Sequence, residues 1–142
     1  MSDVDGWVED RFPYDGPHSQ DTVIEAATAI RELTRYISNA TRHQHTLEWA
    51  ATVRRVSNTL AGATWLQDEV LDRLADGMTR LAEDRTLYHE DTPSRDRGHG
   101  DPKAAATARE AARVLGEARK AVRVSATALD TVAQTVYPLG NE

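Results

Sequence analysis

The stretch AAATAREAARVLGEARKAVRVSATALDTVAQTV, residues 104–136, decides the fold, because small and branched apolar residues recur in it at alternating spacings of three and four. Residues at these spacings share one face of an α-helix. The stretch therefore predicts a long amphipathic helix. Its apolar row consists of Ala104, Ala108, Ala111, Leu115, Ala118, Val122, Ser125, Leu129, Val132 and Val136.

Two earlier stretches have the same rhythm. The first is formed by Val23, Ala26, Ile30, Leu33, Ile37 and Ala40. The second is formed by Trp49, Val53, Val56, Leu60, Ala63, Gln67, Val70, Leu74, Gly77 and Leu81. Three such rows predict an all-α antiparallel three-helix bundle with a long middle helix, because antiparallel helices pack through seams of this period. A break of the middle helix near Gly62 would instead give a four-helix bundle.

The expected helices run over about 21–42, 47–88 and 102–137. Asp21 or Thr22 can cap the first helix, and Glu25 completes a capping-box pattern with Thr22. The third helix has its start and stop signals at Asp101, Pro102, Pro138 and Gly140.

The chain divides into a flexible acidic tail over residues 1–20, a bundle domain over 21–137 and a short tail over 138–142. Within the bundle domain, residues 89–101 contain turn-forming residues and no large apolar residue, which predicts a mobile loop. The first tail is expected to lack regular structure because of Gly6, Pro13, Gly16 and Pro17.

The expected helices differ in length, at about 33, 60 and 50 Å for a rise of 1.5 Å per residue. The first helix can cover only half of the middle one. The other half carries apolar residues that include Leu71 and Met78. Because an open apolar surface usually meets a partner, we expect a homodimer or another protein partner.

Composition narrows the function. The net charge of −6 disfavours unspecific attraction to nucleic acid or to an anionic membrane surface. The chain has no cysteine, no signal-peptide pattern and no apolar run long enough to span a membrane, which favours a cytoplasmic protein.

No catalytic or metal-binding constellation is evident, so we expect neither an enzyme nor a bound cofactor. His43 and His45, near Glu48, are two positions apart and share no helical face, which disfavours metal binding. Asp68, Asp72 and Asp76 recur every four residues without the histidine motifs of a carboxylate metal site, and we interpret them as a solvated face.

A basic stripe on the third helix supports an alternative function in nucleic-acid binding. Its members are Arg109, Arg113, Lys120 and Arg123. Acidic neighbours interrupt the stripe and no aromatic residue accompanies it, so we expect charge pairing with the acidic middle helix, within or between subunits, instead.

Aromatic residues in the acidic tail suggest a docking motif. Trp7, Phe12 and Tyr14 lie among five acidic residues, as in short segments that order upon a partner. The alternative is that they fold back over the open seam of this chain. Trp65 on the middle helix is a further candidate anchor.

The segment ELTRYISNAT, residues 32–41, resembles an E-L-x-R-Y-L-N-x-A-T segment of small all-helical actinobacterial proteins. The resemblance extends over about residues 23–136 and implies an all-helical fold, with a loose association with mobile or conjugative elements. A third interpretation is that the chain is a secreted helical protein similar to the small WXG-type secretion substrates. Leu66 and Gln67 follow Trp65 in place of that family's turn, and Thr92 replaces the acid of its export motif. We therefore expect a non-enzymatic interaction or scaffold protein.

Overall fold

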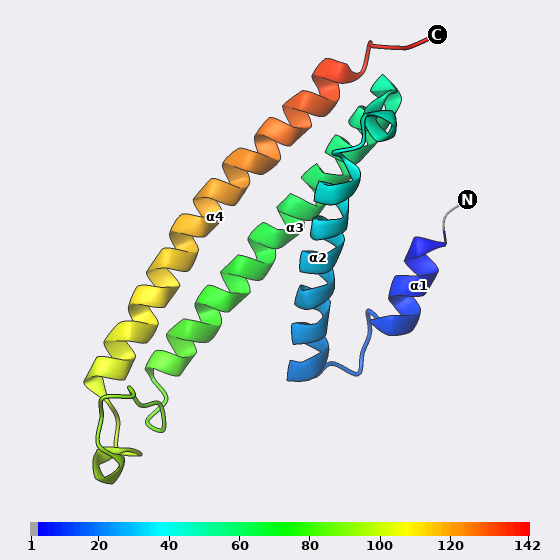
Figure 1. The fold of residues 1–142 in the computed structure, drawn as a ribbon. Helices are drawn as coiled ribbons and strands as arrows, with labels where there is room; N and C mark the ends of the chain where they lie inside the picture. Colours follow the sequence, from blue (N-terminus) through cyan, green and yellow to red (C-terminus); the bar gives the residue numbers. More distant parts are fainter. Residues whose placement is uncertain (1–2) are drawn as a thin grey trace. The chain divides into compact units, whose positions relative to one another are not determined.

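The computed structural model describes residues 3–142, and all regular structure in that range is helical (Figure 1). The chain forms two compact units, Met1–Glu48 and Trp49–Glu142. The boundary lies inside the span that the sequence predicts to be one bundle domain. None of the helices in the described range is long and apolar enough to cross a membrane.

The first unit contains helix α1 (Val4–Arg11), helix α2 (Gln20–Ala40) and a short 3-10 helix, η1 (Gln44–Leu47). The prediction that the acidic tail lacks regular structure is wrong for α1, which continues through Gly6. A single glycine costs a helix only about 1 kcal/mol, which neighbouring residues can offset. Residues 1 and 2 of the predicted tail lie outside the described residues.

Helix α2 begins one residue earlier than predicted, and its N-cap is Ser19. The Ser19 hydroxyl accepts a hydrogen bond from the backbone N–H of Thr22 (3.1 Å), and the Thr22 hydroxyl accepts one from the N–H of Ser19 (2.9 Å). This reciprocal pair is a capping box. Glu25, which the sequence analysis placed in the box, instead forms an ion pair with Arg11.

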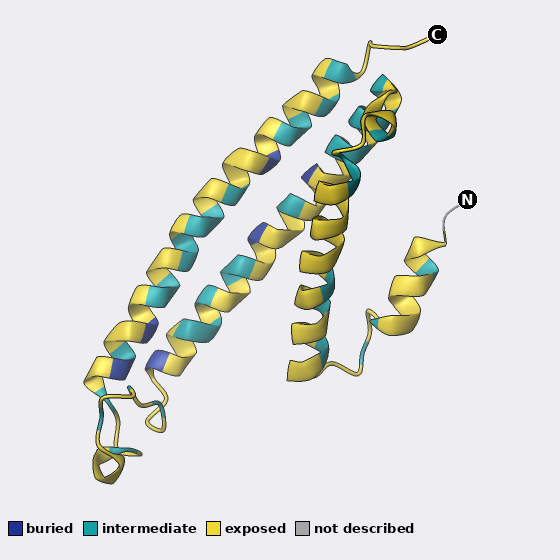
Figure 2. Cartoon of the chain, in the orientation of Figure 1, coloured by how far each residue is buried: buried dark blue, intermediate teal, exposed yellow. Residues whose placement is uncertain are grey.

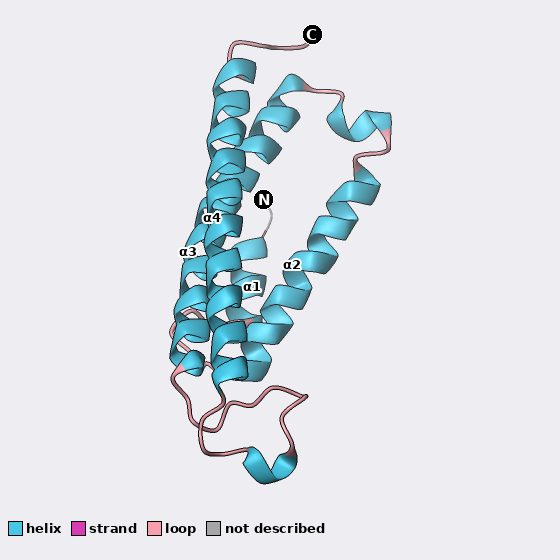
Figure 3. Ribbon diagram, turned by 90° about the vertical axis from the view of Figure 1, so that its left-hand side faces the viewer, coloured by secondary structure: helices cyan, strands magenta, loops and turns pink. Residues whose placement is uncertain are grey.

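The second unit is a helical hairpin of α3 (Ala50–Ala82) and α4 (Pro102–Val136), with a short 3-10 helix, η2 (Ser94–Asp96), in the connection. The two long helices lie side by side and run in opposite directions (Figures 1 and 3). Helix α3 continues through Gly62, so the alternative with a break at that residue is wrong. Nothing lies within 4 Å of the position that a Cβ would occupy there.

Helix α3 ends six residues earlier than predicted, which makes it as long as α4. The carboxylate of Asp84 accepts hydrogen bonds from the backbone N–H and the hydroxyl of Thr86 (2.8 and 2.7 Å), and this local turn competes with continued helix. At 1.5 Å per residue, α3 and α4 span about 50 Å each and α2 spans about 31 Å. The expected mismatch between the two long helices is therefore absent.

The contact between α3 and α4 contains the buried residues, which Figure 2 colours dark blue, and all but one of them are alanines. Its buried residues are Ala61, Ala82, Ala104, Ala108, Ala126 and Asp68. Alanine contributes little apolar area, but it lets two helices approach closely. No large side chain among the described residues is fully buried. The larger apolar side chains of the contact, among them Leu115, Val122 and Leu129, are partly buried.

The predicted packing rows need a correction. On α4, Ala104 and Ala108 are buried as expected, but Ala126 is buried where the sequence analysis placed Ser125. On α3, the row in contact with α4 contains Ala61, one residue after the predicted Leu60. Spacings of three and four average 3.5 residues and drift around a helix of 3.6 residues per turn, so the periodicity alone leaves two neighbouring rows as candidates.

Candidate protein interface

An apolar stripe follows α3 beside the row that packs against α4. Val70 and Leu74 are 51% and 50% exposed, and Leu60 and Leu81 are exposed as well. These are the residues that the sequence analysis assigned to the bundle core. Within the second unit nothing covers them.

A second apolar stripe follows α4. Val114 and Val132 are both exposed, and small residues at Ala121 and Ser125 continue the same side of the helix. The side chains here are smaller than those of the α3 stripe. The two stripes therefore differ in the size of their side chains, which are larger on α3 than on α4.

Both stripes lie on the same side of the hairpin. On α3, Leu60 comes one residue before the buried Ala61, and Leu81 comes one before the buried Ala82. On α4, Ser125 comes one residue before the buried Ala126. One residue turns a helix by about 100°. The two helices are right-handed and antiparallel. A step of one residue back from the contact therefore leads to the same side of the hairpin on both helices. We call this surface, formed by Leu60, Val70, Leu74, Leu81, Val114, Ala121, Ser125 and Val132, the apolar face.

The opposite side of the hairpin is polar and ties the helices together. Arg119 of α4 donates hydrogen bonds to Asp68 (3.0 Å) and Asp72 (2.8 Å) of α3, and Arg123 donates to the other oxygen of Asp68 (3.1 Å). Hydrogen bonding by Arg119 lowers the pKa of the Asp68 carboxyl group and outweighs the opposing effect of desolvation. The acidic row that the sequence analysis assigned to solvent is thus an interhelical ion-pair network.

Trp65 also lies on this polar side. Its indole Nε1–H donates to the carboxylate of Asp130 at 3.0 Å, which connects α3 to α4. Trp65 remains partly exposed. Its hydrogen bond to Asp130 was not predicted from the sequence. A tryptophan and an aspartate on different helices carry no sequence signal that pairs them.

The other predicted interface residues of α3 lie at the border of the apolar face. Leu71 and Met78 are half-buried, between the α4 contact and the exposed stripe. They can support the apolar face from beneath, whereas Leu74 and Val70 present more of their surface.

The predicted basic stripe is largely neutralised by neighbouring acids. Arg113 pairs with Glu110 (2.7 Å), Lys120 pairs with Glu117 (3.2 Å), and Arg123 joins the Asp68 network. Arg109 has no ion pair within residues 3–142. Only Arg123 pairs with the acidic row of α3, as expected from the sequence, whereas Arg113 and Lys120 pair with acids of α4 itself.

The aromatic residues of the first unit divide into two groups. Phe12 and Tyr14 line a shallow groove together with Val23 and Ala26 of α2. Trp7 on α1 is outside that groove and more than half exposed. The structure thus brings two of the three predicted docking residues together.

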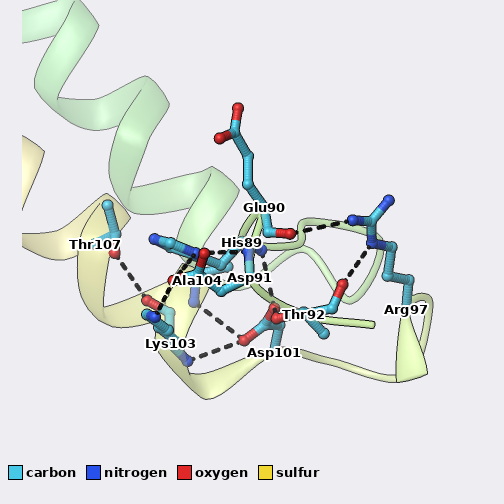
Figure 4. Close-up of polar contacts among 9 residues, drawn as sticks. All are labelled: His89, Glu90, Asp91, Thr92, Arg97, Asp101, Lys103, Ala104 and Thr107. Atoms are coloured by element: carbon cyan, nitrogen blue, oxygen red, sulfur yellow. Dashed lines mark hydrogen bonds and ion pairs between the residues drawn. The ribbon is translucent and has the colours of Figure 1, made fainter. Parts of the chain in front are cut away.

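The loop predicted to be mobile holds a hydrogen-bond network centred on Asp101 (Figure 4). Its carboxylate accepts from the backbone N–H groups of His89 (2.9 Å), Lys103 (3.0 Å) and Ala104 (3.2 Å), and from the hydroxyl of Thr92. The hydrogen bond from His89 makes the largest contribution to lowering the pKa of Asp101, which falls to about 2. The sequence analysis identified Asp101 as the N-cap of the third helix, and that prediction is confirmed.

Two cationic side chains, Arg97 and Lys103, make further contacts that cross-link the loop. The Arg97 guanidinium lies 3.8 Å from the centre of the Tyr88 ring and donates to the backbone oxygen of Thr92 (3.0 Å). Lys103 forms an ion pair with Asp91 at 2.6 Å. Sequence reasoning missed this cross-linking because its partners are separated by turn residues that resemble an unstructured segment.

Within residues 3–142, no three histidine, cysteine or acidic side chains gather in a way that could hold a metal ion. Comparisons of the chain with protein-family models, curated proteins and solved structures found no match. What the fold and the site define is therefore an all-helical chain whose long hairpin has one polar side and one exposed apolar side.

Proposed function

We propose that this chain is a non-enzymatic interaction protein that binds protein through the apolar face of the α3–α4 hairpin and acts as a homodimer. The observation that carries the proposal is the row of exposed Leu60, Val70, Leu74 and Leu81 along α3, which Ala63, Gln67 and Gly77 interrupt, together with exposed valines on the same side of α4. A contiguous apolar surface of this kind on a soluble chain marks an interaction site.

The weak core of the hairpin supports the same proposal. Its buried side chains are five alanines and Asp68. The larger apolar side chains of the contact, such as Leu115 and Leu129, are only partly buried. The hairpin therefore gains less from burial than a closed core would, since the hydrophobic contribution scales with the apolar area removed from water. A further helical layer on the apolar face would supply the missing burial.

The three-helix bundle predicted from the sequence is the competing arrangement. It would cover the apolar face with an amphipathic helix of the same chain, and α2 has such a face, with Ile30 and Leu33 exposed. At about 31 Å, α2 is about as long as the apolar face from Leu60 to Leu81, so an experiment has to distinguish this arrangement from the homodimer.

Light scattering over a concentration series distinguishes these arrangements. We expect the full chain to have twice its mass of 15.7 kDa. Val114→Glu should place one charge per copy in the interface and weaken the dimer at least about 100-fold, because burying an unpaired carboxylate is costly. The variant should therefore have the mass of one chain at low micromolar concentration.

The matched control is Val124→Glu, ten residues further along the same helix. Val124 is 71% exposed and lies on the side of α4 that points away from α3. The same change of valine to glutamate should leave the dimer intact. A wild-type chain with the mass of one copy at every concentration would refute the proposal, and so would equal effects of the two variants.

A further inference from the structure

We infer that two copies pair with α3 of each copy packed on α4 of the other, about a two-fold axis parallel to the helices. This inference rests on the proposed function, because it requires the apolar face to bind a second copy. It goes beyond that function by specifying which helices meet, in which direction and at which residues.

The first argument is the size of the apolar face. From Leu60 to Leu81 it is about 32 Å long at 1.5 Å per residue, and two neighbouring helices are about 20 Å wide. The resulting area of roughly 640 Å² per copy lies at the lower end of the about 600–1,000 Å² per partner of a standard stable interface. A second hairpin matches the face in length and width, because it carries the same face.

The second argument is the difference in side-chain size between the stripes. The α3 stripe carries three leucines and one valine, with Ala63, Gln67 and Gly77 between them, whereas valine is the largest residue of the α4 stripe. Large side chains fill space best when they pack against small ones. An axis parallel to the helices places each α3 over the α4 of the partner, whereas an axis across the helices would place large on large and small on small.

The third argument is which residues of α3 and α4 lie at the same height along the hairpin. The interhelical contacts between Asp68 and Arg119 show which residues of α3 and α4 lie at one height. By the same pairing, Leu74 lies level with Val114, and Val56 lies level with Val132. Rotation about an axis parallel to the helices preserves height, so Leu74 of one copy would meet Val114 of the other.

This pairing makes every neighbouring pair of helices antiparallel, as in an up-and-down four-helix bundle. It also leaves the polar sides, with their Asp68 and Arg119 ion pairs, on the outside. Both connections between α3 and α4 would lie at the same end of the dimer. The two Asp101-centred loops would therefore form one composite surface.

The absence of native cysteine gives a direct test. Leu74→Cys and Val114→Cys are prepared separately, checked for helicity, mixed and oxidised, and covalent dimers are identified by mass. We expect a mixed disulfide between the two variants at several times the yield of either homodimer. As a control, mixing Leu74→Cys with Val124→Cys should give no more than background.

A second measurement reads the orientation without relying on disulfide geometry. A spin label at Arg95→Cys in each loop should give an interspin distance well below the about 50 Å length of the helices. A dimer with distances of about 50 Å or more and no mixed disulfide would overturn this inference and leave the proposed homodimer standing. A single-chain mass by light scattering before oxidation would overturn the proposed function itself.

Discussion

Replacing Ala126 by leucine tests whether α3 and α4 pack through the row that contains Ala61 and Ala126. Ala126 is 0% exposed and Ala61 is 1% exposed. Leucine would add three carbon atoms at a point where the helices already touch. The helices would have to move apart, which would also lengthen the hydrogen bonds between Asp68 and Arg119.

The expected cost can be estimated from overpacking in other cores, where extra methylene groups destabilise by about 1–3 kcal/mol. For domains of about 60–100 residues, 1 kcal/mol corresponds to a shift in Tm of about 4–8 °C. The variant should therefore melt roughly 5–20 °C below the wild type. Thermal unfolding followed by circular dichroism measures this shift, at one fixed protein concentration because a dimer's Tm depends on it.

Ala106→Leu is the matched control, because Ala106 is an exposed alanine of the same helix. Its change in unfolding free energy should stay within about 0.5 kcal/mol. If Ala126→Leu were as neutral as Ala106→Leu, the helices would pack through another row. That result would refute the assignment of the contact and also of the apolar face, which is defined relative to it.

Three further predictions concern other parts of the second unit. Gly62→Ala should raise the free energy of unfolding by about 0.5–1 kcal/mol, because α3 is continuous at Gly62 and space is open around it. Gly98→Ala should lower the free energy of unfolding, because Gly98 has a φ of +91°. Urea titration of both variants measures the contrast. Asp101→Ala should increase amide hydrogen exchange in the loop. Since the pKa of Asp101 is lowered to about 2, its contribution to stability is present above about pH 4 and is lost as the pH falls toward 2, so the acid-induced loss of stability should be smaller in the variant. Asp68→Asn should lower the urea midpoint, and the difference from wild type should shrink in 1 M NaCl if the charges of Arg119 and Asp68 act as an ion pair; an unchanged midpoint would contradict the network.

Local signals in the sequence identified the helices well. The apolar periodicity predicted three long helices, and α2, α3 and α4 lie where the three rows do. Asp101 and Pro102 correctly marked the start of α4. Such signals act within one or two turns, so one stretch of sequence contains them completely.

Helix ends that depend on competition between nearby side chains were less predictable. Asp21 or Thr22 was predicted to cap α2, whereas the structure uses Ser19. Asp84 ends α3 by binding the backbone of Thr86, although the surrounding composition is compatible with helix. The helix α1 was missed because its glycine and acidic residues resemble a flexible segment.

The division of apolar residues between the two faces of the hairpin required the tertiary structure. Leu60 and Ala61 are both compatible with a helical seam, and only the contact with α4 shows that Ala61 is buried and that Leu60 is exposed. The ion pairs of Asp68 with Arg119 and Arg123 cross between helices and have no local signature.

The sequence by itself determined that this protein is helical and where its long helices lie, because helix periodicity and capping are properties of neighbouring residues. Only the tertiary structure decided which row of each helix is buried, because neighbouring rows differ by one residue and the choice depends on the opposing helix. The contact between α3 and α4 contains buried alanines and the ion pair of Asp68 with Arg119. The larger apolar side chains were thereby left on the outside, where they form the proposed interface.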